Sequence, residues 1–100
     1  MIDVSAHNNK ATLIDDAATN VGSIIRILED SLDYLNYNES NKIDSFKSDL
    51  ESKIILLKQI KQDLTNSAST IRTKATQIYN EQKAAEEERL KAEEEKKQNN

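Results

Sequence analysis

Apolar residues recur at helical spacing along the first third of the chain. Four of them stand seven residues apart: Ile14, Val21, Leu28 and Leu35. The positions between them are filled by Ala17, Ala18, Ile24, Ile25 and Leu32. A repeat of this kind gathers apolar side chains on one side of an α-helix. The pattern predicts an amphipathic helix over residues 8–36, which could begin as early as Ser5 with its hydroxyl as the cap.

The second half of the chain carries a longer repeat. One apolar row recurs every seven residues without a break: Ile43, Leu50, Leu57, Leu64, Ile71, Ile78 and Ala85. A second row is supplied by Phe46, Ile54, Ile60, Ala68 and Ala75. A sustained heptad is typical of a coiled-coil seam. We therefore expect a second, longer helix from about residue 43 onward.

Between the two patterns lies a polar stretch, residues 36–42, rich in Asn and Ser. These residues bond their own backbone and favour turns and caps over helix interiors. Ser40 or Asn41 is a natural cap for the second helix, and Asp44 suits its first turn. The fold class predicted is all-α: a helix–turn–helix hairpin of two long antiparallel helices, the second with coiled-coil character.

Composition supports few turns and a small core. The chain of 100 residues has no Pro, one Gly and four aromatic residues. Pro and Gly mark loops, so their scarcity fits long helices. We expect a hairpin over residues 1–85 and a charged extension over 86–100, either helical or disordered. A chain with so little core usually gains stability by associating, so we predict that it is not a stable monomer alone.

The charge pattern limits the kinds of partner. Net charge is −4, with acids and bases interspersed, whereas nucleic-acid binding needs a basic stripe. No apolar run approaches the ~18 residues that cross a bilayer. The first residues lack the basic end and apolar core of a signal peptide. We expect a cytoplasmic protein whose export, if it occurs, needs no cleaved signal.

No residue pattern indicates catalysis. His7 is the only histidine and there is no cysteine, so neither a metal site nor an activated nucleophile is expected. The adjacent acids Asp15 and Asp16 point about 100° apart on a helix and do not converge. No Gly-rich loop is present to hold phosphate. We expect a protein that is not an enzyme and that binds no cofactor.

Folding the two helices into a hairpin leaves part of the second without a neighbour. A helix over residues 8–36 is about 43 Å long at ~1.5 Å per residue. Running antiparallel, it reaches along the second helix only to about residue 71. We therefore expect the remaining seam residues to be bare and to bind a partner: Ile71, Ala75, Ile78 and Tyr79.

Four consecutive large apolar residues, 54–57, cover more of the second helix than one neighbour can bury. At ~100° per residue they span about 300° of its surface. Exposed apolar surface of this extent usually marks an interface. We expect Ile55 and Leu56, together with Ile25 of the first helix, to lie off the intramolecular seam and to dock a helical partner.

Two helices and a turn near residue 40 in a short acidic chain without cysteines resemble the WXG-type small proteins of type VII secretion. Residues 5–80 carry the likeness, which is closest to the small helical proteins that accompany LXG toxins. The resemblance implies a targeting or chaperone role. Its partner would be the toxin's helical N-terminal domain, with or without a second small helical protein.

The chain departs from the family pattern at the turn and at the export signal. Asn36-Tyr37-Asn38 stands where the family has Trp-x-Gly, and Tyr79 is followed at the fourth position by Lys83 instead of an acid. A Phe-x-x-x-Asp motif is approximated by Phe46 and Asp49, with the acid one residue early. Two other readings stay open: a general coiled-coil scaffold or homodimer, and a bacteriocin-type immunity protein.

Overall fold

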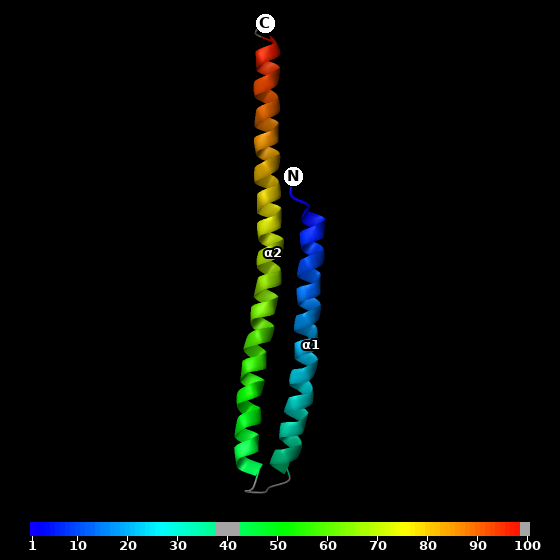
Figure 1. Cartoon of the computed structure of the whole chain (residues 1–100), viewed down its shortest axis with the longest axis vertical. Coiled ribbons are helices and arrows are strands. Elements are labelled where there is room, and N and C mark those ends of the chain that lie inside the picture. The colour runs from blue at the N-terminus through cyan, green and yellow to red at the C-terminus, as the bar shows by residue number, and fades with distance from the viewer. Residues whose placement is uncertain (38–42, 99–100) are drawn as a thin grey trace.

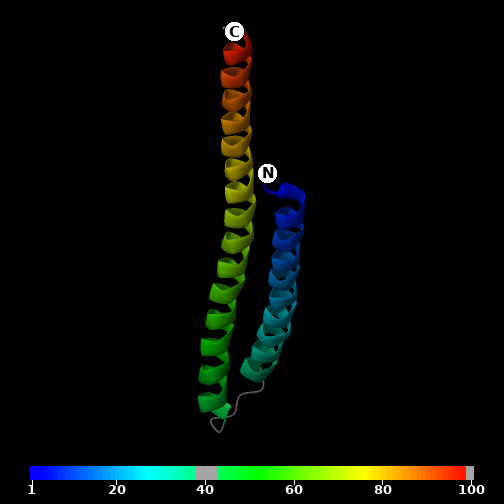
Figure 2. The ribbon, with the colours of Figure 1, turned by 45° about the horizontal axis from the view of Figure 1, so that its top comes forward.

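The computed structural model describes residues 1–37 and 43–98, and it shows two α-helices running antiparallel, α1 (Val4–Tyr37) and α2 (Asp44–Gln98) (Figure 1). The second view keeps them side by side along α1 (Figure 2). The molecule measures 90 × 17 × 12 Å. The described residues contain no strand. The all-α hairpin with a longer second helix is therefore confirmed.

The break between the helices falls where the polar stretch predicts it. Helix α1 ends at Tyr37 and α2 begins at Asp44. The proposed caps Ser40 and Asn41 lie outside the described residues. Asp44 stands in the first turn of α2 and pairs with Lys47 at 3.6 Å, which places a negative charge at the positive end of the helix dipole.

Helix α1 starts earlier than residue 8, because Asp3 caps it. The Asp3 carboxylate accepts a hydrogen bond from the Ala6 backbone N–H at 3.0 Å. This bond satisfies one of the first backbone donors, which have no partner inside a helix. Ser5 lies within the first turn of the helix. The prediction of Ser5 as the cap is therefore wrong.

The seam between the helices follows heptad rows in both. The residues that the packing buries are Ala11, Ala18 and Ile25 from α1 and Leu50, Ile54, Ala68 and Ala75 from α2. Phe46 and Ile60, expected in the second row, remain 58% and 38% exposed. The buried row stands four residues after the Ile43 row, whereas Phe46 and Ile60 stand three after it. One residue rotates a side chain by about 100°, which carries these two out of the seam.

The core changes in character along the hairpin. Near the turn, Ile25, Leu50 and Ile54 form a cluster of large side chains. Half-buried residues pack against it: Val21, Leu28, Leu32, Leu35 and Leu57. Toward the free end of α1, the buried side chains are all alanines: Ala11, Ala18, Ala68 and Ala75. We call these parts the large-residue half and the alanine half.

Gly22 marks a close approach at the middle of the seam. A Cβ at this position would stand 3.0 Å from Lys61 Nζ and 3.3 Å from Lys61 Cε. Lys61 belongs to the same heptad row as Ile54 and Ala68, so its aliphatic stem occupies a seam position. The close contact at Gly22 is therefore made with a side chain of α2.

Helix α1 covers more of α2 than the sequence led us to expect. The Ile2 N–H donates a hydrogen bond to Gln82 Oε1 at 2.6 Å, so the helices run together to about Gln82 instead of residue 71. Ala75 is consequently buried, and Ile71 and Tyr79 are half-buried. The prediction that these three are bare is wrong. Ile78 stays 39% exposed, and Met1 lies beside the next turns of α2, in a hollow lined by Gln82, Ala85, Glu86 and Arg89.

Candidate partner-binding surface

One side of the hairpin is held by ion pairs between the helices. Arg72 lies 2.6 Å from Asp15 and Lys58 lies 3.7 Å from Glu29. All four residues stand next to the buried seam, on the same side of the hairpin. We call this the ion-pair side. The opposite side of the hairpin is called the lateral face below.

Ile25 belongs to the core and not to a docking surface. Its side chain is only 5% exposed and lies in the cluster with Leu50 and Ile54. It stands seven residues after Ala18, in the row that faces α2. The expectation that Ile25 lies off the intramolecular seam is therefore wrong.

Ile55 and Leu56 are both exposed, at 70% and 59%, as expected for residues off the seam. They do not share one surface. Ile55 stands three residues before Lys58 and so lies on the ion-pair side. Leu56 stands four residues before Ile60, which places it toward the lateral face. The three residues proposed as one docking band thus lie in three separate places.

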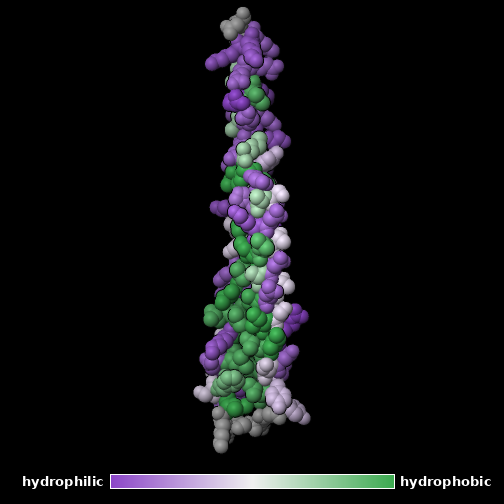
Figure 3. All heavy atoms as spheres, turned by 45° about the vertical axis from the view of Figure 1, so that its right-hand side comes forward, coloured by the Kyte–Doolittle hydropathy of each residue, from purple (hydrophilic) through white to green (hydrophobic). Residues whose placement is uncertain are grey.

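The lateral face carries exposed apolar side chains, and we define its apolar surface by five residues: Ile24, Ile27, Phe46, Leu56 and Ile60. A hollow beside the turn brings the two helices together here, with Ile27 and Leu35 on one wall and Phe46 on the other. Figure 3 shows apolar side chains gathered over the part of the hairpin nearest the turn. Exposed apolar area of this kind marks interaction sites in soluble proteins.

A second, smaller hollow lies at the other end of the hairpin. Its lining combines apolar and polar groups from the two helices and from Ile2, which precedes α1: Ile2, His7, Thr70, Ile71, Lys74, Ala75 and Ile78. Ile71 and Ile78 are thus reachable from this hollow although α1 covers the seam.

Three residues of the lateral face were not singled out from the sequence. Ile24 and Ile60 belong to the apolar rows that predict the two helices, and Ile27 lies outside those rows. The signal that identifies them is a second heptad pattern, displaced by about 100° from the seam on each helix. The sequence alone does not show which flank of α1 lies beside which flank of α2. The ion pair between Asp15 and Arg72 shows this, and it places the second pattern of both helices on the opposite side of the hairpin.

The residues of the approximate export motif lie at the start of α2. Phe46 is exposed on the lateral face, and Asp49 pairs with Lys53 at 2.9 Å. Their spacing of three residues keeps both on neighbouring parts of one helix surface. This surface is accessible, and its role in export stays a prediction.

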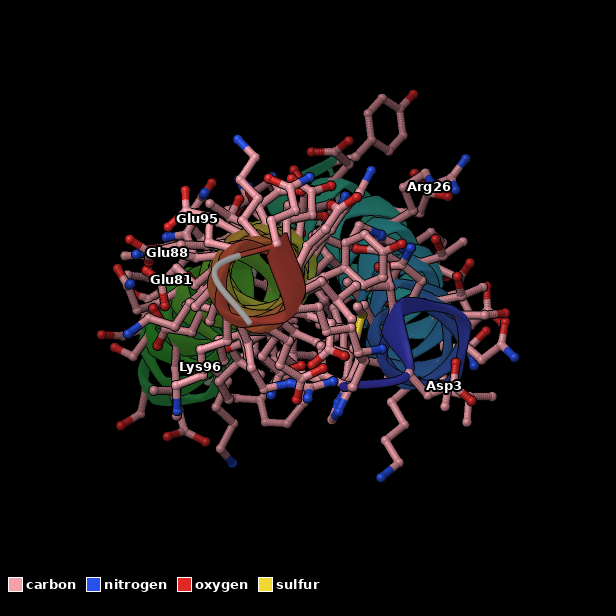
Figure 4. The ribbon with its side chains drawn as sticks, turned by 90° about the horizontal axis from the view of Figure 1, so that it is seen from above. Asp3, Arg26, Glu81, Glu88, Glu95 and Lys96 are labelled. Atoms are coloured by element: carbon pink, nitrogen blue, oxygen red, sulfur yellow. The ribbon has the colours of Figure 1, made fainter. Side chains whose placement is uncertain are left out.

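The α2 extension is charged and ordered as a helix. Arg89 pairs with Glu86 at 2.5 Å and with Glu93 at 2.7 Å. The hydrogen bond from Arg89, with its charge, lowers the pKa of Glu86 below the ordinary value. Figure 4 looks down the molecule and shows Glu81, Glu88 and Glu95 on the side away from α1.

We also searched the described residues for a metal site and for a membrane-spanning helix. Within residues 1–37 and 43–98, no group of three or more His, Cys, Asp or Glu side chains is arranged to hold a metal ion. Neither α1 nor α2 has a stretch both long and apolar enough to span a bilayer. Comparisons with protein families, with curated proteins and with solved structures found no match.

Proposed function

We propose that this chain is a non-catalytic protein-binding module that docks a helical partner on its lateral face. The observation that carries the proposal is the exposed apolar surface of Ile24, Ile27, Phe46, Leu56 and Ile60. Burying a large aliphatic or aromatic side chain contributes roughly 1.5–3 kcal/mol. A partner that covers this surface therefore gains far more than surface charges supply, because exposed ion pairs are worth about 0.2–1 kcal/mol.

The shape of the surface favours a helical partner. The lateral face is a shallow strip along two parallel helix axes, and apolar side chains recur on it at three- and four-residue spacing. An amphipathic helix presents its own apolar side chains at the same spacing. Such a helix, or a pair of helices, packs along the strip as in a helical bundle.

The favoured partner is the N-terminal helical domain of an LXG-type toxin. Support comes from the likeness in helix number, turn position and acidic character to the small helical proteins that accompany such toxins. In this role the chain covers the toxin's apolar helices and presents the complex to the type VII secretion machinery. The exposed pair Phe46 and Asp49 then supplies part of the export signal.

The proposal predicts that a gene for an LXG-type toxin lies beside the gene for this chain, and co-expression with the N-terminal domain of that toxin tests the binding. We expect the two proteins to co-purify at a fixed ratio. Ile27→Glu should weaken this binding by a hundredfold or more, since it removes an apolar contact and buries a charge. Circular dichroism should show unchanged helix content, because Ile27 is 64% exposed.

Ile55→Glu is the matched control for this experiment. Ile55 is as exposed as Ile27 but lies on the ion-pair side, so its substitution should leave toxin binding within a fewfold of wild type. Equal loss with both variants would remove the lateral face as the docking surface. Failure of the wild-type chain to bind the adjacent toxin domain would overturn the proposed partner.

A further inference from the structure

We propose that the ion-pair side carries a binding site for a small soluble phosphate monoester, in the middle of the hairpin between α1 and α2. The site is a hollow of about 420 Å³ whose lining includes Gly22, Arg26, Glu29, Lys58 and Lys61. Its volume falls within the range of small-molecule sites, roughly 300–1,000 Å³. We call it the basic hollow. It lies on the side opposite the lateral face, so the inference goes beyond the proposed function and does not rest on it.

Basic side chains predominate in the basic hollow, although the chain as a whole is acidic. The net charge of the chain is −4. Of the ionisable residues that line the hollow, three are basic, namely Arg26, Lys58 and Lys61, and only Glu29 is acidic. Three positive charges and one negative charge leave a local charge of +2. A phosphate monoester carries a charge of about −1.5 to −2 at neutral pH, so the hollow matches it better than a single carboxylate.

The cations of the basic hollow have hydrogen-bond donors left for a ligand. Within residues 1–37 and 43–98, Arg26 and Lys61 take part in no ion pair. Lys58 Nζ stands 3.7 Å from Glu29 Oε2, which is longer than the roughly 2.7–2.9 Å of a charge-assisted hydrogen bond. An ammonium group has three donors and a guanidinium group has five. A phosphate in the hollow therefore meets donors that no carboxylate of the described residues occupies.

Gly22 belongs to the lining of the basic hollow, and the packing of the helices does not require a glycine there. It is the one glycine of the chain, its φ is not positive, and it stands inside α1, where only Pro is a poorer helix former. The three atoms nearest to a Cβ at this position all belong to the flexible end of Lys61, with Nζ at 3.0 Å. A side chain that can turn away does not demand a glycine opposite it. Gly22 instead keeps open the space that the ammonium group and a ligand share.

The two helices hold their cations at different depths of the basic hollow. Lys61 shares the heptad row of Ile54 and Ala68, so its aliphatic stem lies along the seam and its ammonium group lies over Gly22. Figure 4 shows Arg26 extending outward from α1, and this exposed side chain forms part of the rim. A phosphate bound between Lys61 and Arg26 therefore contacts one cation from each helix.

Acidic residues on either side of the basic hollow favour a small ligand over a polyanion. Toward the free end of α1, Arg72 is already paired with Asp15 at 2.6 Å. Toward the turn, Asp33 stands seven residues after Arg26, in the same heptad row of α1. A nucleic acid or an anionic membrane spreads its charge over many phosphates and would meet these carboxylates. A single phosphate inside the hollow avoids them.

Titration with glycerol phosphate provides the first test, and the single glycine of the chain supplies the signal. Glycine amides resonate apart from those of other residues, so Gly22 gives one resolved signal in an NMR spectrum of the isotope-labelled full chain. Glycerol phosphate, exchanged for sodium chloride at constant ionic strength to hold screening fixed, should move this signal along a saturating curve. Inorganic phosphate should do the same. A signal that moves no more than in the chloride reference, or that does not saturate, would overturn the site.

Removal of one cation at a time tests the residues of the site. Lys61→Gln and Arg26→Gln should each raise the dissociation constant for glycerol phosphate by about tenfold or more, because each removes a charged donor. Lys74→Gln is the matched control, since it removes the same charge from α2 but lies in the hollow at the open end. It should leave the dissociation constant nearly unchanged. Equal weakening by Lys61→Gln and Lys74→Gln would mean that only net charge attracts the anion, which would overturn the site.

Gly22→Ala separates binding from folding. The new Cβ stands 3.0 Å from Lys61 Nζ, so the ammonium group must move away, and glycerol phosphate should bind severalfold more weakly. The same change should raise the melting temperature by a few degrees, because Ala is the better helix former. A variant that binds less while it is more stable cannot owe its loss to damage of the fold. Unchanged affinity in Gly22→Ala, or a lower melting temperature, would overturn the inference, because Gly22 would then serve packing alone.

Vesicles distinguish a soluble ligand from a lipid headgroup, since phosphatidic acid carries the same phosphate monoester. Phosphatidylcholine vesicles that contain phosphatidic acid should sediment with no more of the chain than vesicles of phosphatidylcholine alone. Binding to these vesicles without binding to glycerol phosphate would overturn the inference. The result is also independent of the proposed function, because Ile27→Glu on the lateral face should bind glycerol phosphate as tightly as wild type. Loss of phosphate binding in Ile27→Glu would place the anion on the lateral face and overturn the site.

Discussion

Ile54, Ile55 and Leu56 are consecutive, yet each lies in a different environment. Ile54 is buried against α1, Ile55 is exposed on the ion-pair side, and Leu56 is exposed toward the lateral face. Hydrophobicity alone does not distinguish them. The rotation of about 100° per residue does, once the buried row is known. A run of consecutive apolar residues on a helix therefore predicts that other segments pack against it. It does not show which of the residues faces which segment.

Truncation of Ile25 tests its new place in the core. Ile25→Ala should lower the free energy of unfolding by about 2–4 kcal/mol, because a buried aliphatic side chain is removed and leaves a cavity. Ile55→Ala, at a 70% exposed position, should cost well under half as much. Urea denaturation followed by circular dichroism measures both. Equal destabilisation by the two variants would contradict the burial of Ile25.

The contact between Arg89 and Glu86 gives a pH dependence confined to the α2 extension. Because the hydrogen bond and charge of Arg89 lower the pKa of Glu86 in the helix, the contact favours the helix above the carboxyl's ordinary pKa. That contribution is lost as the pH falls through the lowered value. An NMR titration of Arg89→Gln should show the pKa of Glu86 rising toward its ordinary value.

Arg89→Lys is the control for this titration. It keeps the positive charge but loses the planar group that reaches Glu86 and Glu93 together. The pKa of Glu86 should then fall between its values in wild type and in Arg89→Gln. A Glu86 pKa that is the same in all three proteins would show that the contact does not persist in solution.

At the scale of helices, the sequence predicted the number, order and direction of the elements. The heptads ending at Leu35 and restarting at Ile43 are a local property, and they required no knowledge of the packing. The start of α1 and the position of the lateral face could not be predicted in this way, because they depend on contacts in the folded chain. The start of α1 depended on which of several polar residues near Asp3 acts as cap. The lateral face depended on the antiparallel pairing, which ion pairs such as Asp15–Arg72 fix only in three dimensions.

The α2 extension should be dispensable for the hairpin. A chain ending after Ala85 keeps the bond from Ile2 to Gln82 and every buried residue. Residues 86–98 are all exposed, and exposed ion pairs such as Arg89–Glu93 contribute little to stability. Calorimetry should give a melting temperature within about two degrees of the full chain.

A second truncation checks the limit of the pairing. Ending the chain after Lys74 removes Ala75, which is buried, and Gln82. This protein should melt several degrees lower than the one ending after Ala85. A comparable loss on removing residues 86–100 alone would show that the extension packs on another surface, such as a second copy.

For the molecule as a whole, the two halves of the hairpin differ in how strongly they are held. The large-residue half fully buries Ile25, Leu50 and Ile54, whereas the fully buried side chains of the alanine half are all alanines. Apolar burial contributes in proportion to area, so the alanine half gains less. Asn8 adds a cost there, because its Oδ1 is buried without a hydrogen-bond partner among the described residues. Arg72 partly offsets this by bridging Asp15 and Thr12.

Hydrogen exchange should therefore follow a gradient along the hairpin. Local opening exposes amides with free energies that depend on how much each region buries. We expect amides near Ala11 and Ala18 to exchange through local opening, faster than those near Ile25. Arg72→Met should accelerate the first group further, because it removes the bridge to Asp15, and should leave the second nearly unchanged. Uniform exchange along α1 would mean that the hairpin opens only as one unit. In that case the two halves would be equally stable despite their different cores.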